Sequence, residues 1–304
     1  MAQSAQDEIS HDKRPYPAGE MVELTPLVRR LISPNPGPFT FTGTCGYIVG
    51  RGRVAVIDPG PDDEAHIQAL AAALAGETVE HIVVTHTHRD HSPGARRLRD
   101  MTGAKIVGCA SHVPIEHDSS GRLDASHDLD HAPDLRMSDG DTLEGRGFSL
   151  TAVHTPGHAS NHLCFALREE NALFSGDHVM AWSTSIVAPP DGAMSDYMAS
   201  LDKLRARDDA IFWPGHGGPV NDPQRYMRAL ANHRRLREAA IVGAIEAGES
   251  TIPDIVLRIY QGLDPRLRNA AGLSVLAHLE DLVARGRVRA DSPATLTARY
   301  EPAG

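Results

Sequence analysis

Four side chains that commonly bind metal ions lie within six residues of one another: His86, His88, Asp90 and His91. They directly follow an apolar run at 82–84, so we expect a buried strand to end there and to leave them on a loop. Imidazole nitrogens and carboxylate oxygens are common ligands of Zn²⁺, and the spacing of His86 and His88 lets both face one ion. The pattern His-x-His-x-Asp-His is far more specific than any single histidine among the 17 of this chain. The segment therefore predicts a metal site.

Three further ligands that such a site needs stand downstream, each in a loop bounded by Gly or Pro. His154 precedes the turn at 155–158 and would complete a first ligand set, and His216 would complete a second. Asp177 is suited to bridge two ions, because a carboxylate can give one oxygen to each. Two ions about 3.5–4 Å apart activate a water molecule and stabilise negative charge on a substrate oxygen. Asp90 would also position the nucleophile and take its proton, so we predict it as the catalytic residue.

Four other residues near these ligands have two interpretations each. His158 and His162 would orient the ligands or donate to a leaving group, or they belong structurally to a Pro-Gly turn and the strand after it. His178 faces the cavity, or strand alternation turns it away. Trp182 lines the substrate pocket, or it lies in a plain surface loop. Residues 112–140 are rich in His and Asp without a ligand spacing, and we expect a solvated lid there.

Composition sets wide limits on the rest of the molecule. The formal net charge of −10 argues against a protein that coats nucleic acid non-specifically. Three cysteines without a C-x-x-C spacing indicate buried thiols rather than a disulfide framework. The first twenty residues are polar and unlike a signal peptide, and no apolar run has the length of a membrane span, so we expect a cytoplasmic protein.

The pattern of elements indicates an α/β protein with a smaller second unit. We expect a disordered tail over 1–20, a hydrolase domain over 21–222, and a linker helix with a small domain over 223–304. Strands with polar residues at their ends alternate with helices in the hydrolase domain. The expected strands are 39–49, 54–57, 79–85, 105–109, 148–154, 162–167, 171–175 and 211–213, and the expected helices begin at Asp62, Ser92-Pro93 and Ser195.

Residues 223–304 have the outline of a winged helix. Leucines recur at helical spacing within the last of the helices expected at 224–247, 252–260 and 271–284, and a hairpin is expected between 288–290 and 295–300. From 254 to 304, seven arginines stand against six acids, so the charge of this unit does not require nucleic acid as a partner. Packing against the hydrolase domain or a dimer partner is the favoured use.

The ligand motif resembles the metallo-β-lactamase superfamily, together with the stretches at 155–158, 175–177 and 214–217. The resemblance covers about residues 22–222 and implies an αββα sandwich with the site along one edge. True zinc β-lactamases lack the bridging acid Asp177, whereas thioesterases, phosphodiesterases and nucleases of the superfamily have it. The resemblance places one metal on His86, His88 and His154 and the other on Asp90, His91 and His216.

The stretches 169–177 and 197–201 and the C-terminal unit resemble the β-lactamase-like protein 2 group in particular. A mitochondrial member of that group is a single-strand endoribonuclease. The resemblance implies a hydrolase with two Zn²⁺, iron or manganese also being compatible with imidazole ligands. A metal-bound hydroxide would attack a phosphodiester of RNA or a nucleotide.

Two alternatives stay open. One is a thioester, ester or lactone hydrolase of the glyoxalase II type, although residues 223–304 do not resemble the helical C-terminus of that enzyme. The other is a non-catalytic, metal-bound nucleic-acid-binding or scaffold protein. The expected partners are a small molecule or single-stranded RNA as substrate and a second copy in a homodimer, with no membrane partner.

Overall fold

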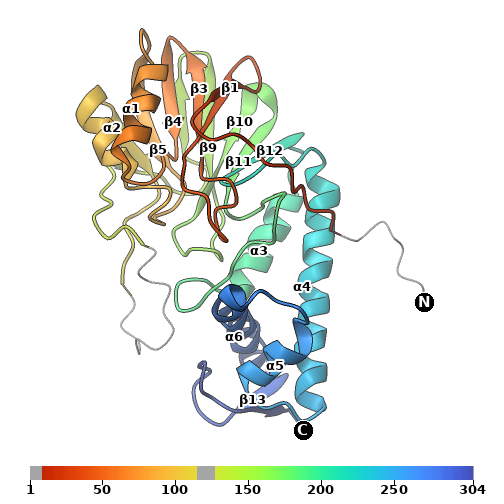
Figure 1. Ribbon diagram of the computed structural model, residues 1–304. Coiled ribbons are helices and arrows are strands. Elements are labelled where there is room, and N and C mark those ends of the chain that lie inside the picture. The colour runs from red at the N-terminus through yellow and green to blue at the C-terminus, as the bar shows by residue number, and fades with distance from the viewer. Residues whose placement is uncertain (1–8, 115–126, 304) are drawn as a thin grey trace.

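Two β-sheets lie face to face in the computed structural model, which describes residues 9–114 and 127–303 (Figure 1). The first sheet has seven strands in the order β1 to β7, and the second has five in the order β12-β11-β10-β9-β8. The strands of the first sheet are β1 (Met21–Glu23), β2 (Val28–Ile32), β3 (Cys45–Arg51), β4 (Arg53–Ile57), β5 (Thr78–Val84), β6 (Lys105–Gly108) and β7 (Leu135–Arg136). Those of the second are β8 (Thr142–Gly145), β9 (Phe148–His154), β10 (Leu163–Leu167), β11 (Ala172–Gly176) and β12 (Ile211–Pro214).

Strand β10 shows how the sequence builds the layers. Its five residues are all buried, with Leu163, Phe165 and Leu167 in the core shared by the two sheets. Cys164 and Ala166 belong instead to the core beneath the helices of the second sheet. Successive side chains of a strand point to opposite faces, so a continuous apolar run is what a strand between two cores requires.

Helices cover the outer face of each sheet. α1 (Glu64–Ala73) and α2 (Gly94–Thr102) pack on the first sheet, and α3 (Met194–Arg205) and α4 (Pro223–Glu246) pack on the second (Figure 1). The predicted αββα sandwich is therefore confirmed. No helix in the described parts is long and apolar enough to cross a bilayer.

Helix starts differ slightly from the expected ones. Asp63 rather than Asp62 caps α1, accepting a hydrogen bond from the main-chain N–H of His66. The helices α2 and α3 begin without a side-chain cap. Ser92 instead donates its hydroxyl to Asp128. The side chain of Ser92, which the local sequence predicts as a helix cap, thus makes a tertiary hydrogen bond instead.

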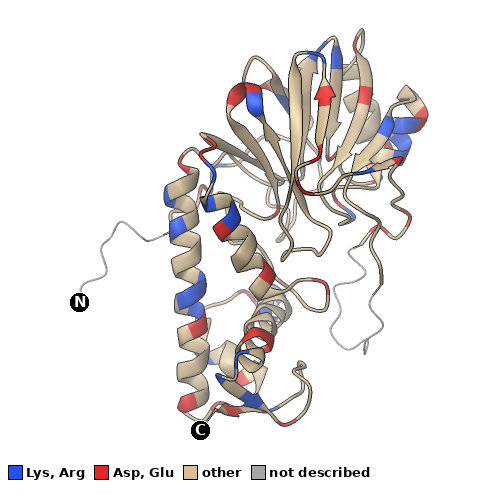
Figure 2. Ribbon diagram, turned by 180° about the vertical axis from the view of Figure 1, so that it is seen from behind, with Lys and Arg blue, Asp and Glu red and all other residues tan. Residues whose placement is uncertain are grey.

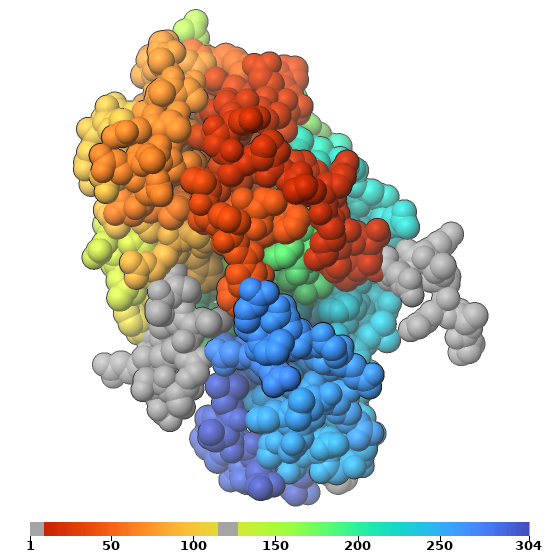
Figure 3. All heavy atoms as spheres, in the orientation of Figure 1, coloured from red at the N-terminus to blue at the C-terminus, as the bar shows by residue number. Residues whose placement is uncertain are grey.

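The C-terminal unit is a winged helix with its own core. It contains α5 (Ile252–Ile259), α6 (Arg268–Ala284) and the hairpin of β13 (Val288–Ala290) and β14 (Tyr300–Pro302). Buried side chains of both helices and of the hairpin pack with the end of α4. Figure 3 shows this unit, in blue, lying directly against the rest of the molecule. The predicted winged-helix domain is confirmed.

Two segments are more ordered than the sequence suggests. Residues 9–20 are not a disordered tail, because Ile9 and Tyr16 pack against the cores of the sandwich and the Asp12 N–H donates to the carbonyl of Ala181 at 2.9 Å. Residues 1–8 of the expected tail lie outside the described residues. Isolated apolar side chains within a polar stretch provide these anchors. The prediction of disorder rested on the average composition of the stretch, which does not register single apolar residues.

Part of the segment 112–140, expected to be a solvated lid, is likewise buried. His112, His127, Asp128 and His131 are all buried. Asp128 pairs with Arg96 at 2.7 Å, which ties this segment to α2. Residues 115–126 lie outside the described residues.

Candidate metal centre

The loop after β5 carries His86, His88, Asp90 and His91, and a buried carboxylate holds it in place. The Thr85 N–H and hydroxyl donate to Asp58 at 2.8 and 2.7 Å. The ring of His91 donates from Nδ1 to the same carboxylate at 2.9 Å. Sequence reasoning missed Asp58; the available signal was an acid between the apolar strand β4 and a Pro-Gly turn. Its role is to orient a candidate ligand and the turn that carries it.

His86, His88 and His158 form the first ligand group. Nδ1 of His88 lies 3.0 Å from Nε2 of His86 and 3.0 Å from Nε2 of His158. Ligand atoms around a tetrahedral Zn²⁺ lie roughly 3.3 Å apart, given bonds of about 2.0–2.1 Å. Burial and then neighbouring imidazoles hold the pKa values of His86 and His88 well below the usual range, so these rings stay neutral. The group fits a divalent cation.

His154 does not join this group, which corrects its predicted place in the first ligand set. It is the last residue of β9, pairs with Leu163 across the strands, and turns its exposed ring towards the carbonyl of Ser160 at 3.3 Å. The turn that follows contains Gly157 at φ +133°, a conformation that favours glycine. This turn brings His158 back to His88. A signal for this was present, because Pro-Gly-His occurs twice in the chain, at 156–158 and 214–216.

Asp90, His91 and His216, the three residues that the sequence assigns to one ion, lie together as the second group. Oδ2 of Asp90 lies 3.4 Å from Nε2 of His91 and 3.2 Å from Nε2 of His216. Asp177 lies between the two groups, with Oδ2 3.6 Å from Nε2 of His158 and 3.3 Å from Nε2 of His216. Its Oδ1 is buried without a hydrogen-bond partner among the described residues. Asp177 therefore lies where a bridging carboxylate would.

The partners of the ring nitrogens test whether cations fit here. Three rings face an acceptor oxygen with Nδ1, which places their lone pairs on Nε2 when they are neutral. These contacts are His91 to Asp58 at 2.9 Å, His158 to the Ile186 carbonyl at 2.7 Å and His216 to the Gly43 carbonyl at 3.2 Å. All three Nε2 atoms lie within 3.6 Å of the Asp177 carboxylate. Converging lone pairs and carboxylates repel one another unless protons or cations lie between them, so the donor set fits two divalent ions.

In the metal-free chain, protons collect on the second group. Burial by itself lowers the pKa of His216, but Asp177 and Asp90 outweigh it and raise that pKa to about 10. The same two carboxylates raise the pKa of His91 well above its usual value, again against burial. A cation that binds here must displace these protons.

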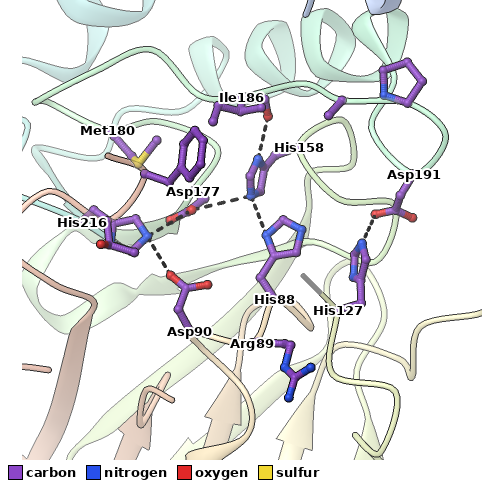
Figure 4. A pocket seen from close by; sticks show the side chains of 14 residues that line it. His88, Arg89, Asp90, His127, His158, Asp177, Met180, Ile186, Asp191 and His216 are labelled. Carbon is purple, nitrogen blue, oxygen red and sulfur yellow. Dashed lines mark hydrogen bonds and ion pairs between the residues drawn. The ribbon is translucent and has the colours of Figure 1, made fainter. Parts of the chain in front are cut away.

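A cavity of about 390 Å³ opens onto the two groups. Figure 4 shows His88, His158, Asp177, His216 and Asp90 converging on it. The remaining wall is mostly apolar, and Arg89 is the one cation that the described part of the chain contributes to it. Beyond the ligands, the cavity is lined by Phe39, Thr40, Arg89, His127, Met180, Ile186, Ala188, Pro189 and Asp191.

The other residues singled out from the sequence lie behind this wall. Nε2 of His162 accepts from the main-chain N–H of Asp177 at 3.2 Å, so it supports the bridging acid. His178 is fully buried and outside the cavity lining, packed against Tyr197. Trp182 also lies outside the lining and stacks on Phe41 with ring centres 5.0 Å apart.

A third cluster combines His112 and His127 with Asp191. The two rings are stacked 3.8 Å apart at 9°, and each faces one oxygen of the carboxylate, at 3.7 and 3.5 Å. Ring lone pairs lie in the ring plane, so parallel rings cannot both aim at one ion. In contrast, the His86–His88 and His88–His158 rings stand at 81° and 88°. His127 and Asp191 of this cluster form part of the cavity wall, and His112 stacks behind them.

Comparison with known proteins shows the family to which this chain belongs. The sequence matches the metallo-beta-lactamase superfamily over residues 39–216 and the beta-lactamase associated winged helix domain over residues 251–294. The chain belongs to the metallo-beta-lactamase superfamily and is a metal-dependent hydrolase.

Three relatives illustrate the range of the family. The chain is 31% identical over 274 residues to a beta-lactamase-like protein 2 homolog of Caenorhabditis elegans, covering 88% of this chain and 87% of that one. It is 33% identical over 230 residues to an atrochrysone carboxyl ACP thioesterase of Paecilomyces divaricatus, covering 74% and 67%. A metallo-beta-lactamase family protein from Thermus thermophilus superposes with a TM-score of 0.74 at 25% identity, covering 92% and 100%.

Proposed function

We propose that the chain hydrolyses an ester or thioester with a largely apolar acyl group, at a pair of divalent cations for which zinc is our first choice. The observation that carries this proposal is the composition of the cavity wall. Sequence reasoning favoured a phosphodiester, and the cavity instead supports the alternative named there.

The wall opposite the metal groups is built from apolar side chains. The cavity is faced by Phe39, Met180, Ile186 and Pro189. An acyl chain bound against these side chains would be removed from water. A nucleic-acid backbone needs several cations facing its phosphates. Among the described residues of the lining, Arg89 is the single cation, against three carboxylates. A neutral, apolar substrate therefore fits the cavity better than a polyanion.

Two groups of side chains would hold the cations: His86, His88 and His158 for one, and Asp90, His91 and His216 for the other, with Asp177 shared. When bound, the cations would supply a water of lowered pKa and positive charge for the carbonyl oxygen of the substrate.

Asp90 is the candidate base of the reaction. Its side chain is 27% exposed at the cavity, and Oδ2 accepts from the Thr44 hydroxyl at 3.1 Å. It would take the proton of the attacking water and later return it to the leaving thiol or alcohol. The water oxygen joins the acyl carbon, and the carbon–sulfur or carbon–oxygen bond breaks.

The thioesterase relative lends support through its name only. The 33% identity makes it a relative of this chain, and the substrate in its name is the substrate of that relative. What it contributes is that a chain of this family with comparable sequence cleaves a thioester.

The test is a panel of acyl thioesters and esters of increasing chain length, with metal-replete protein. Burying each methylene contributes about 0.8 kcal/mol, so kcat/KM should rise about threefold to fourfold per methylene until the cavity is full. Asp90→Ala should remove the activity, and His154→Ala, outside the site, should keep it.

A second candidate, cleavage of a phosphodiester in single-stranded RNA or a nucleotide, rests on Arg89. Its exposed guanidinium lines the cavity and pairs with no carboxylate within the described parts. If the protein cleaves RNA but no acyl substrate, and Asp90→Ala loses that cleavage, the ester proposal is wrong. A purely scaffolding role is disfavoured by the ligand geometry around Asp177.

A further inference from the structure

The segment 178–193, here called the pocket loop, connects β11 to α3 without helix or strand. Met180, Ile186 and Pro189 of this loop form much of the apolar cavity wall. A loop without a ladder of its own needs other contacts to fix its main chain. What holds the pocket loop therefore shapes the cavity.

The pocket loop also orients a candidate metal ligand. The Ile186 carbonyl accepts from Nδ1 of His158 at 2.7 Å, as Figure 4 shows. This contact fixes the tautomer and the plane of the ring, so Nε2 points to His88 and Asp177. Displacing Ile186 would therefore turn His158.

The neighbouring carbonyl is held from α4, the long helix that leads into the C-terminal unit. Arg234 donates from Nη2 to the Ser185 carbonyl at 2.5 Å. Its guanidinium lies 4.8 Å from the centre of the Tyr197 ring on α3. The hydroxyls of Ser185 and Tyr197 both donate to the His178 carbonyl, at 2.8 and 3.2 Å. The residue after the bridging acid is thus tied into the same cluster.

Arg234 is an unusual residue for this position. It is 3% exposed, its Nε has no hydrogen-bond partner, and no carboxylate pairs with it within residues 9–114 and 127–303. A buried guanidinium without a counterion is unfavourable, and an apolar side chain of similar length would serve simple packing better. The hydrogen bond of Arg234 leads to the pocket loop, and its ring contact leads to Tyr197, which supports that loop.

We propose that Arg234 is a positioning residue, which fixes the pocket loop through Ser185 and thereby sets the orientation of His158 at the metal. By this inference α4, the helix that leads into the C-terminal unit, is part of the active-site architecture. The inference rests on the proposed metal site but not on the identity of the substrate.

The same helix offers a matched control. Arg237 lies three residues further on, and its buried Nε has no hydrogen-bond partner in the part of the chain that the structure describes. It donates from Nη1 to the Ile259 carbonyl at 3.0 Å. Its guanidinium lies 4.0 Å from the centre of the Tyr260 ring. Like Arg234, Arg237 thus contacts one main-chain carbonyl and one tyrosine ring. Its two contacts lie at the end of α5, away from the cavity.

The experiment compares Arg234→Met with Arg237→Met in the full chain loaded with Co²⁺. The absorption spectrum of bound Co²⁺ reports ligand geometry, and the rate of loss to a chelator reports retention of each ion. We expect Arg234→Met to change the spectrum and to release one of the two ions at least about tenfold faster. Arg237→Met should keep the wild-type spectrum and release rate, although it unfolds at lower urea concentration.

The other outcomes are also decisive. Wild-type spectra and release rates in both variants, or equal changes in both, would overturn the inference while leaving the metal site intact. A wild-type chain that binds no Co²⁺ would overturn the metal site and this inference together. Should Arg234→Met fail to fold, Arg234→Lys against Arg237→Lys decides by the same two measurements, because lysine keeps the charge but loses the planar stack on Tyr197.

Discussion

His158 lies in the first ligand group, where the sequence predicted His154. Both histidines stand near the end of β9, and a spacing argument cannot separate them. Strand alternation sends the His154 side chain outwards, and the turn at Gly157 returns His158 to the ligand group. The choice between them depends on a backbone turn, which spacing alone does not specify.

This correction is directly testable. His158→Ala should bind one metal ion fewer per chain and lose at least about 100-fold in kcat/KM, because a ligand is missing. His154→Ala should retain both ions and stay within about threefold of wild type. Metal content by atomic emission, with kinetics on the same samples, checks both. Equal losses in the two variants would contradict the assignment.

The raised pKa of His216 gives the metal-free chain a defined pH dependence. Asp177 and Asp90 stabilise the protonated ring, and its pKa of about 10 exceeds the ordinary value of 6.5. This contribution is therefore fully present below about pH 6.5 and is lost as pH rises towards 10. Urea unfolding of the chelator-treated protein at pH 6.5 and pH 9.5 measures it. His216→Gln should flatten the fall in stability with pH, whereas an unchanged slope would show that another group causes it.

At the scale of elements, strand ends bring the ligands together. β5, β9, β11 and β12 each end in a loop that carries one or more of them. Most strands, the helices of the C-terminal unit and most residues of the two ligand groups could be predicted, since apolar runs, leucine spacing and the His-x-His-x-Asp-His motif are local patterns. The strands β1, β2, β7 and β8 were not expected, and β3 begins at Cys45 rather than at residue 39. The cavity wall could not, because Ile186 and His127 reach it from segments with no such pattern. Asp58 was missed for the same reason, its partners being 27 and 33 residues away.

The surroundings of Gly215, between β12 and His216, show how closely these strand ends approach one another. A Cβ added there would lie 2.4 Å from Oδ1 of Asp177 and 2.7 Å from Cε1 of His91. Gly215→Ala should therefore weaken metal binding at least about tenfold by moving both side chains. Gly243→Ala within α4 meets nothing within 4 Å and should stabilise the fold by roughly 0.5–1 kcal/mol. Competition with a chromophoric chelator would detect the difference; equal affinities would contradict the clash.

At the scale of the whole molecule, charge is spread rather than concentrated. Figure 2 shows acidic residues interspersed with or next to basic ones over most of the ribbon. Two arginines near the wing, Arg285 and Arg289, are paired with acids. Arg225, Arg228 and Arg235 of α4 are exposed, and no ion pair engages them in the portion of the chain described. These three side chains, here called the α4 stripe, are exposed cations that an anionic molecule could contact.

The α4 stripe sets a limit on RNA binding. Each phosphate contact to a single strand contributes about −0.7 to the slope of log K against log salt, so three arginines allow about −2. We expect single-stranded RNA to bind weakly with a slope no steeper than that, and Arg225→Glu with Arg228→Glu to abolish it. Fluorescence anisotropy over a salt series measures both. A slope much steeper than −2, unaffected by these changes, would indicate a different and more basic surface.

The two ligand groups draw on both halves of the sandwich. His86, His88, Asp90 and His91 extend from the first sheet, whereas His158, Asp177 and His216 extend from the second. Bound ions would thus act as non-covalent cross-links between the sheets, closing chain loops as a disulfide does without using the three buried cysteines. Amide hydrogen exchange would then slow in β5 and β11 together on metal addition, so that two sheets which could open separately become one cooperative unit.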